Sequence, residues 1–278
     1  MLFLLRKLSF STSLFSVSRS RVTSMATTGN NSDLISSKLA ALAQQLRLYK
    51  PPGFDSDKGV SISQLGFTEP VGDQLPEKLN PNKAAVLICL FHGCNDGDGL
   101  RVILTKRSSG LSSHPGEVSL PGGKVEEGDV DDADTATREA KEEIGLEPSL
   151  VNVVAVLEPF LSKHLLRVTP VIGILSDRNA FDPTPNVAEV DEVFDAPLEM
   201  FLKDENRTSE EREWMGNRLL IHYFNYETGG KKFMIWGLTA GILIRAASVV
   251  YQRPPAFLEQ IPNIKLPGVI GIDDTKSP

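Results

Sequence analysis

The sequence predicts an α/β domain in which a mixed β-sheet lies between helices. Three observations support this prediction. Apolar, β-branched runs of strand length recur from residue 83 onward, a helical pattern separates them at 131–144, and an apolar helical pattern follows at 237–251. Strands and helices in this order are typical of an α/β domain. The chain has 278 residues, of which 41% are hydrophobic and 23% charged, so it can bury a sizeable core.

The first 32 residues differ in composition from the rest of the chain. They contain no Asp or Glu, and among many Ser and Thr they carry Arg6, Lys7, Arg19 and Arg21. This composition is typical of a transit peptide, so we expect residues 1–24 to direct the chain into mitochondria. A shorter cytosolic form starting at Met25 and a merely disordered tail are the alternatives.

The net charge bears on the class of partner. It is −7 for the whole chain and becomes −11 if residues 1–24 are removed, because that segment holds four basic and no acidic residues. An acidic surface argues against non-specific binding of nucleic acid, which requires a basic surface. No apolar run reaches the roughly 18 residues of a membrane span, so we expect no stable membrane insertion. The oligomeric state stays open, with a homodimer among the alternatives.

The elements are expected in the following order. Ser32–Tyr49 reads as a helix because its leucines recur near helical spacing, and prolines end it. Residues 25–82 comprise this helix and a Gly-, Pro- and Ser-rich linker, residues 83–255 form the domain, and residues 256–278 form a tail. Within the domain we expect strands at Lys83–Phe91, Leu100–Thr105, Val151–Leu161 and Leu166–Leu175, a helix at Val190–Leu202, a hairpin of Trp214–Tyr226 with Lys231–Trp236, and a C-terminal helix at Gly237–Tyr251.

The cysteines and tryptophans are interpreted as structural. Cys89 lies in an apolar run and Cys94 in the polar turn after it, and neither has the spacing of a metal site or a disulfide framework. Both are therefore expected to be reduced thiols, as free cysteines commonly are. Trp214 and Trp236 are expected to pack in the core.

The clearest helix is Asp131–Ile144. One face carries an apolar stripe that can pack on a sheet, and Gly145 ends the helix. Three acids fall on the adjoining arc, namely Glu139, Glu142 and Glu143. Like charges at this spacing destabilise an isolated helix by about 0.2–0.5 kcal/mol per pair, and in the last turn they also oppose the helix dipole. A bound Mg²⁺ or Mn²⁺ reverses the sign of this interaction. For the pattern taken alone, a solvated acidic face is the alternative.

A glycine loop precedes this helix. Leu120–Lys124 has the sequence LPGGK, and its glycines allow the backbone to approach a ligand closely. Arg138 cannot lose its proton, so it can hold the loop through a bidentate contact with a carboxylate such as Asp129 or Glu126. Loop, arginine and acid cluster in this order predict a site for metal ions and a diphosphate.

These residues resemble the Nudix box, whose usual form is G-x5-E-x7-R-E-U-x-E-E-x-G-U, with U an apolar residue. Gly123 matches the first glycine, and residues 138–146 match position by position. Asp129 replaces the first glutamate, and eight residues rather than seven separate it from the arginine. These departures, and LTKRSSGLSSHPGEVSLPGG at residues 104–123, resemble the coenzyme A diphosphatase branch of the Nudix hydrolase family. Residues 83–255 closely resemble plant mitochondrial members of that branch.

The resemblance implies an α/β/α sandwich that uses Mg²⁺ or Mn²⁺ to hydrolyse coenzyme A and acyl-CoA esters to 3′,5′-ADP and (acyl-)4′-phosphopantetheine. It implies metal binding by Glu139, Glu142 and Glu143, which with Arg138 form the catalytic set. It implies substrate contacts from Arg107, Gly122, Gly123, Lys124 and His114. Further candidates for substrate contact are Lys106, Lys163, Arg167 and His164.

Two questions stay open at this stage. The general base is one of the box glutamates or an acid outside the box, such as Glu158 or Glu189. The substrate could instead be NADH, ADP-ribose or capped RNA, or the chain could be a non-catalytic binding module on the same fold. The residues at 104–123 favour the coenzyme A branch, the acidic surface argues against RNA, and the retained glutamates favour an enzyme.

Overall fold

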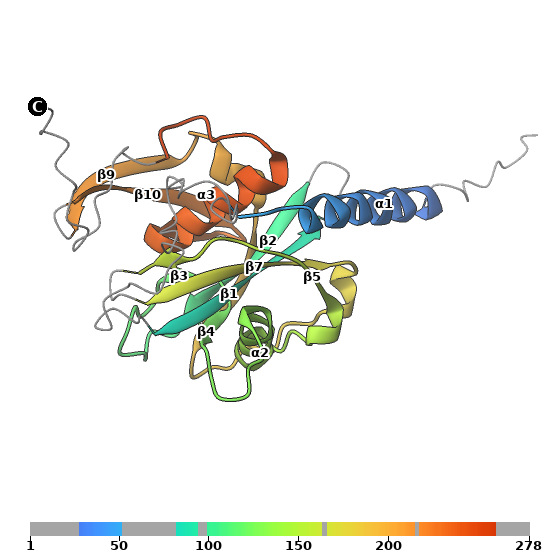
Figure 1. Ribbon diagram of the computed structural model, residues 1–278, viewed down its shortest axis with the longest axis horizontal. Coiled ribbons are helices and arrows are strands. Elements are labelled where there is room, and N and C mark those ends of the chain that lie inside the picture. Colours follow the sequence, from blue (N-terminus) through green and yellow to red (C-terminus); the bar gives the residue numbers. More distant parts are fainter. Residues whose placement is uncertain (1–27, 52–81, 94–98, 163–165, 215–216, 260–278) are drawn as a thin grey trace, which may run out of the picture.

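The computed structural model describes residues 28–51, 82–93, 99–162, 166–214 and 217–259. Its central feature is an eight-stranded mixed sheet with helices on both faces (Figure 1). The predictions for residues 1–24 and Met25, for Cys94, and for Lys163 and His164 lie outside the described residues.

Strands and helices follow one another largely as expected. The strands of the main sheet are β1 (Lys83–His92), β2 (Leu100–Arg107), β3 (Val118–Ser119), β4 (Gly122–Lys124), β5 (Val151–Val156), β6 (Phe160–Leu161), β7 (Arg167–Leu175) and β8 (Val190–Pro197). The helices are α1 (Thr28–Arg47), α2 (Asp132–Ile144) and α3 (Gly237–Tyr251). A second, three-stranded sheet consists of β9 (Arg207–Trp214), β10 (Asn217–Thr228) and β11 (Lys231–Trp236). Short 3₁₀ turns lie at Pro148–Leu150, Arg178–Ala180 and Leu198–Leu202.

The strand β1 organises the main sheet. It pairs in parallel with β7 and antiparallel with β2 and β4, so the sheet is mixed. Successive side chains of a strand point to opposite faces. In β1, Ile88 and Leu90 accordingly join one buried core, whereas Leu87 and Cys89 join another. The Cys89 thiol is therefore a free, buried core group, as its apolar surroundings predicted.

Helices cover both faces of this sheet, which gives the expected α/β/α sandwich. α2 packs on one face through Ala136, Ala140 and Ile144, which are fully buried. α1 and α3 lie on the other face (Figure 1), where Leu46 and Leu243 are buried in the larger core. Burying a large aliphatic side chain stabilises the fold by roughly 1.5–3 kcal/mol. Within the described ranges, no helix is long and apolar enough to cross a membrane.

The segment Val190–Leu202 is not the helix that its periodicity predicted. Its first eight residues form β8, which pairs with β2, and the rest is a 3₁₀ turn. Pro197 explains part of the difference, because a proline inside a helix removes a hydrogen bond and clashes with the preceding turn. The apolar spacing instead reflects alternate burial along a strand, with Phe194 and Ala196 on the buried face.

Three smaller expectations also need correction. Val151–Leu161 forms two strands, β5 and β6, rather than one. The predicted hairpin is confirmed as β10 with β11, but Trp214 belongs to the neighbouring strand β9. Trp236 is only half-buried and stacks on Tyr223, with the ring centroids 5.5 Å apart, instead of lying in the core.

Candidate active site

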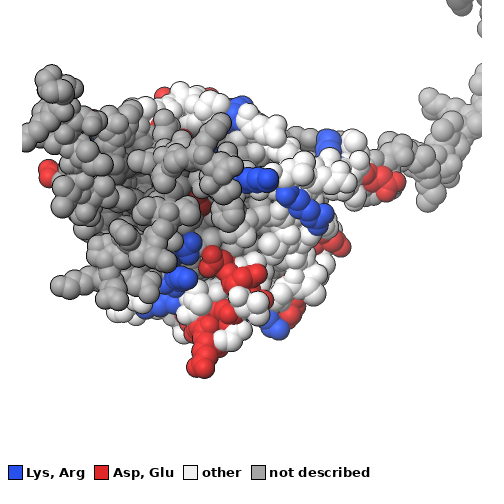
Figure 2. Space-filling model, in the orientation of Figure 1, with Lys and Arg blue, Asp and Glu red and all other residues white. Residues whose placement is uncertain are grey.

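The helix α2 carries the predicted acid cluster and has well-defined ends. Asp131 caps its first turn, because its side chain accepts a hydrogen bond from the Asp134 amide at 2.9 Å. Gly145 ends it with a φ of 73°, a left-handed conformation that suits glycine. Since the apolar face of α2 is fixed against the sheet, its glutamates project from a rigid element. Figure 2 shows acidic side chains gathered over α2 and the preceding loop, with basic side chains beside them.

Glu143 is the most buried acid of the cluster. Only 5% of its surface is exposed, and its Oε2 accepts a hydrogen bond from the Gly122 amide at 3.2 Å. Burial raises the pKa of Glu143 to about 7, although the Gly122 amide opposes this shift. The carboxylates of Glu139 and Glu189 raise it further, whereas Arg107 lowers it. Glu143 therefore shares a nearly closed environment with two acids and one arginine.

Glu139 lies one turn before Glu143 and against the glycine loop. A Cβ atom added to Gly123 would overlap the Glu139 carboxylate, so a larger residue at that position would displace this side chain. Burial raises the pKa of Glu139, and Arg138, whose Nη1 lies 3.2 Å from Glu139 Oε1, opposes the rise. The nearby carboxylates of Glu142 and Glu126 add to it. Glu139 is thus partly desolvated in an acidic neighbourhood.

Gly122 and Gly123 lie in β4 and are held directly against the central strand. They pair with Val86 and Ala85 of β1. Gly122 has a φ of 153°, which side-chain-bearing residues rarely adopt, and a Cβ atom there would lie 2.6 Å from the Cα of Val86. The backbone therefore requires a glycine at position 122, whereas the glycine at position 123 leaves the Glu139 carboxylate its place against the loop.

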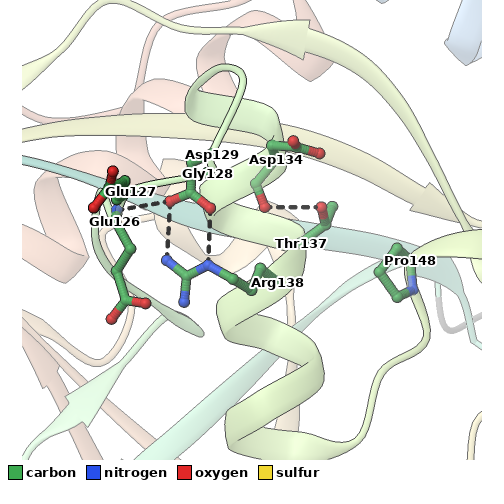
Figure 3. Close-up of a pocket in the computed structure, with 8 residues that line it drawn as sticks. All are labelled: Glu126, Glu127, Gly128, Asp129, Asp134, Thr137, Arg138 and Pro148. Carbon is green, nitrogen blue, oxygen red and sulfur yellow. Dashed lines mark hydrogen bonds and ion pairs between the residues drawn. The ribbon is translucent and has the colours of Figure 1, made fainter.

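Arg138 joins the helix to the loop. Its Nε and Nη2 donate to the two oxygens of Asp129 at 2.9 and 3.0 Å, and Nη2 also donates to the Lys124 carbonyl at 3.1 Å. Its Nη1 donates to Glu142 at 3.1 Å. The hydrogen bonds from Arg138 hold the pKa of Asp129 well below its usual range. Figure 3 shows Asp129 and Arg138 facing each other on the wall of a hollow of about 350 Å³. Asp129, rather than Glu126, is therefore the acid that Arg138 holds.

Arg107 ends β2 close to these glutamates. Its Nε is buried without a hydrogen-bond partner in the part of the chain that the structure describes, and its charge lowers the pKa of Glu143. Its main chain is fixed, because its amide donates to the Glu117 carbonyl at 2.9 Å and its carbonyl accepts from the Gly116 amide at 3.1 Å. A buried donor without a partner costs about 1–3 kcal/mol. Arg107 is thus available to an anionic ligand beside the acid pair.

The other residues expected to contact substrate lie farther out. His114 is exposed, with a φ of 54°, and its Nδ1 lies 2.9 Å from a carboxylate oxygen of Glu117. The side chain of Lys124 is exposed, although its main chain belongs to the glycine loop. Lys106 is half-buried near the C-terminal end of β2, and Arg167 is half-buried at the N-terminal end of β7. The structure therefore brings Arg107 and the two glycines to the acids and leaves His114 and Lys124 at the surface.

The two acids outside the box have different surroundings. Glu158 is 2% exposed and accepts hydrogen bonds from the hydroxyl of Tyr49 at 2.6 Å and from Nε of Arg245 at 2.5 Å. It therefore links the segment after α1 to α3, and both of its carboxylate oxygens are engaged by these two residues. Glu189 is exposed, its carbonyl accepts from the Ser108 amide at 2.8 Å, and its carboxylate raises the pKa of Glu143. Of these two acids, only Glu189 lies at the cluster.

The donor set fits a divalent cation held by Glu139 and Glu143. Burial raises the pKa of both carboxylates even though Arg138 and Arg107 lie near them, so a bound cation would offset a remaining electrostatic cost. Glu142, the third expected ligand, is exposed and paired with Arg138 at 3.1 Å. Among the described residues, no group of three or more His, Cys, Asp and Glu side chains is arranged as a metal centre. Further oxygen ligands would therefore come from the main chain, water or substrate.

Comparisons with known proteins agree with this geometry. A family model described as the NUDIX domain matches residues 81–224. The chain is 66% identical over 242 residues to Nudix hydrolase 22, chloroplastic, of Arabidopsis thaliana, covering 83% of this chain and 78% of that protein. It is 71% identical over 211 residues to Nudix hydrolase 15, mitochondrial, of the same plant, covering 75% and 73%. It is 39% identical over 181 residues to the peroxisomal coenzyme A diphosphatase NUDT7 of Mus musculus, covering 64% and 75%.

The fold and these similarities define an enzyme that hydrolyses phosphoanhydride bonds in nucleoside diphosphate derivatives. The chain belongs to the Nudix hydrolase family, because the family model spans more than half of it and both plant relatives match it over most of their length.

Proposed function

We propose that this Nudix hydrolase cleaves the diphosphate of coenzyme A and of acyl-CoA esters to 3′,5′-ADP and (acyl-)4′-phosphopantetheine, with Mg²⁺ or Mn²⁺ as cofactor. The observation that carries the proposal is Arg107, whose buried Nε has no hydrogen-bond partner among the described residues and whose charge acts on Glu143 of the acid cluster. Arg107 also belongs to residues 104–123, which resemble the coenzyme A branch. The similarity to the mouse protein named as a coenzyme A diphosphatase supports the same substrate class.

The chain's own groups have separate roles in this proposal. Glu139 and Glu143 hold the cation, which, when bound, neutralises diphosphate charge and lowers the pKa of a water. Arg138 keeps the glycine loop and α2 in a fixed relation. Gly122 and Gly123 let β4 lie directly against β1 and against the Glu139 carboxylate, which holds the glycine loop beside the proposed metal ligands.

Glu189 is the proposed proton acceptor outside the box. A general base must lie within hydrogen-bond reach of the water that it activates, directly or through one more water. Glu189 meets this requirement better than Glu158, because its main chain is anchored beside Arg107 through Ser108 and its carboxylate acts on Glu143.

Arg107 provides a basis for substrate choice. The 3′-phosphate of coenzyme A is an anionic group that NADH and ADP-ribose lack. If Arg107 pairs with it, a substrate without this group leaves a buried cation unpaired. Such a loss costs a few kcal/mol, or about 100-fold in kcat/KM.

A substrate panel tests the proposed function. The purified enzyme with Mg²⁺ is given coenzyme A, acetyl-CoA, NADH or ADP-ribose, and the nucleotide products are separated and quantified. We expect 3′,5′-ADP from both coenzyme A substrates, with kcat/KM about 100-fold above that for NADH, and no product in the presence of EDTA. A higher efficiency on NADH or ADP-ribose would replace the proposed substrate, and undiminished activity in EDTA would remove the metal requirement.

We also propose that the chain starting at Met1 enters mitochondria. The acid-free, Arg- and Ser-containing residues 1–24 support this location, as does one relative named as mitochondrial. The other two relatives are named chloroplastic and peroxisomal, so imaging must distinguish three organelles. A fluorescent fusion of the chain from Met1 is expected in mitochondria and a fusion starting at Met25 in the cytosol. A chloroplast or peroxisome signal for the longer form would contradict this proposal.

A further inference from the structure

Thr135 is a buried threonine of α2 whose side chain reaches the pair formed by Asp129 and Arg138. None of its surface is exposed, and its Oγ1 donates to Oδ2 of Asp129 at 2.8 Å. The other acceptor near this hydroxyl, the Asp131 carbonyl, is farther away at 3.3 Å. A hydroxyl has one proton to donate. The distances therefore direct that proton to the Asp129 carboxylate.

The hydroxyl completes a set of donors that fixes the Asp129 carboxylate. Oδ2 accepts from Thr135, from the Glu126 amide at 2.9 Å and from Nη2 of Arg138 at 3.0 Å. Oδ1 accepts from Nε of Arg138 at 2.9 Å. The hydrogen bonds to a carboxylate decide its rotation, and charge-assisted pairs are sensitive to that rotation. With both oxygens engaged, Asp129 presents one geometry to Arg138.

Thr135 lies where this chain departs from the usual Nudix box. Asp129 is one methylene shorter than the glutamate of the usual pattern, and the interval to Arg138 has one residue more. Thr135 lies within that longer interval, on the buried side of α2. A shorter acid has less reach of its own. The hydroxyl beside it offsets the loss by holding the carboxylate toward the arginine.

The position of Asp129 is passed on to the acid cluster through Arg138. With Nε and Nη2 on Asp129, the guanidinium also places Nη2 against the Lys124 carbonyl and Nη1 3.2 Å from Oε1 of Glu139. The same group thus contacts the glycine loop and a proposed metal ligand. A rotation of the Asp129 carboxylate would shift the guanidinium and both of these contacts.

We propose that Thr135 is a positioning residue of the metal site, acting through Asp129 and Arg138 on Glu139 and the glycine loop. It contacts neither metal nor substrate. The proposal rests on the proposed function only in taking Glu139 as a metal ligand. Residues that orient metal-binding groups from behind commonly change metal affinity or activity by about 10–100-fold when replaced.

Thr137 provides a matched control in the same helix. It is also a buried threonine, 9% exposed, but its Oγ1 partners among the described residues are the main-chain carbonyls of Ala133 at 2.9 Å and Asp134 at 3.2 Å. Figure 3 shows the Thr137 hydroxyl joined to the Asp134 carbonyl and not to Asp129 or Arg138. Replacing either threonine by valine keeps the shape and removes one hydroxyl. Only the Thr135 change removes a bond to Asp129.

The test compares Thr135→Val, Thr135→Ser and Thr137→Val with the wild type in the full chain. Mn²⁺ binding without substrate is measured by electron paramagnetic resonance, and kcat and thermal unfolding are measured alongside. We expect Thr135→Val to weaken Mn²⁺ binding about tenfold or more and to lower kcat, Thr135→Ser to restore both, and Thr137→Val to leave both unchanged. If Thr135→Val does not fold, Thr135→Ala compared with Thr135→Ser makes the same comparison.

The outcomes separate this proposal from the proposed substrate. Equal Mn²⁺ affinities for the Thr135→Val and Thr137→Val proteins, or a failure of Thr135→Ser to restore binding, would overturn the positioning role. A wild type that binds Mn²⁺ with the expected pattern among variants, yet releases no 3′,5′-ADP from coenzyme A, would support Thr135 and reject only the substrate. A wild type that binds no Mn²⁺ would overturn both.

Discussion

The main-chain amide of Gly122 donates a hydrogen bond to Oε2 of Glu143 across 3.2 Å. This bond joins the glycine loop to the acidic end of α2, and it involves the acid whose pKa burial raises to about 7. One carboxylate therefore supports the loop and belongs to the proposed metal site. Loop geometry and metal affinity should consequently change together when either partner is altered.

Replacing either proposed metal ligand should abolish turnover while leaving the fold intact. Glu139→Gln and Glu143→Gln each remove a charge that balances the cation, so we expect kcat to fall by about 100-fold or more. Thermal unfolding should change little, because a neutral amide is less costly to bury than a carboxylate. The control is Glu147→Gln, an exposed acid just beyond α2 that pairs with Lys141. Near-normal kcat at saturating Mg²⁺ in either variant would remove that glutamate from the metal site.

A single methyl group on the glycine loop should disrupt the site. In Gly123→Ala the added Cβ atom meets the Glu139 carboxylate, so the loop or the ligand must move. A displacement of about 1 Å can lower the rate about 100-fold. In Gly110→Ala the nearest atom, Oγ of Ser108, is 3.7 Å from the added Cβ atom, so that variant is the matched control. Steady-state kinetics that were alike in the two variants would contradict the tight fit at Gly123.

The two acids outside the box should separate stability from catalysis. Glu158→Gln leaves the half-buried Arg245 without its charged partner, which should lower the free energy of unfolding by about 3 kcal/mol with little effect on kcat of the folded enzyme. Glu189→Gln should leave unfolding unchanged and lower kcat by about 100-fold, as expected for loss of a general base. Denaturant titrations and initial rates on the same samples give both quantities. The opposite pattern would reassign the roles of Glu158 and Glu189.

The buried histidine of β10 should make stability depend on pH. His222 is 3% exposed, and both ring nitrogens have a partner: Nδ1 lies 3.0 Å from Nη1 of Arg207, and Nε2 lies 2.7 Å from the Glu259 carbonyl. Because Arg207 can only donate, Nδ1 accepts and Nε2 donates, which requires a neutral ring. Burial lowers the pKa of His222, the Glu259 carbonyl opposes this, and Arg207 lowers it further.

The sign of the pH effect follows from that lowered pKa. Below the ordinary histidine pKa of about 6.5, the unfolded chain binds a proton that the folded protein does not. The contribution of neutral His222 is therefore complete above that pH and is lost as the pH falls toward the folded-state value. We expect wild type to lose more stability than His222→Gln between pH 7.5 and about 5.5, measured by urea unfolding. Parallel pH profiles for the two proteins would contradict a neutral buried His222.

The parts of the site that the sequence predicted are those with local signals. The acids of α2 follow one another at helical spacing, Gly122 and Gly123 are adjacent, and Asp129 and Glu126 are candidate partners for Arg138, of which the structure shows Asp129. Such features depend on a few neighbouring residues, so periodicity and residue chemistry were sufficient. The C-terminal helix, α3, was placed with its correct bounds for the same reason.

The parts that the sequence did not predict depend on pairings across long separations. Glu158 bonds to Arg245 and Tyr49, which both lie far from it in the sequence, and no local sequence pattern marks such a triad. Thr135 resembles any other small residue on the buried side of a helix, and only the position of the preceding loop gives its hydroxyl a partner. The apolar spacing of Val190–Leu202 predicts a helix, whereas pairing with β2 makes its first part the strand β8.

The most direct test of the account compares coenzyme A with dephospho-coenzyme A, which differ only in the 3′-phosphate. The measurement is kcat/KM for both substrates with Mg²⁺, in wild type and in Arg107→Ala. We predict that wild type prefers coenzyme A by about 100-fold and that Arg107→Ala loses most of this preference, because the variant lacks the guanidinium that would pair with the 3′-phosphate. Equal efficiency of the wild type on the two substrates would contradict recognition of coenzyme A through its 3′-phosphate.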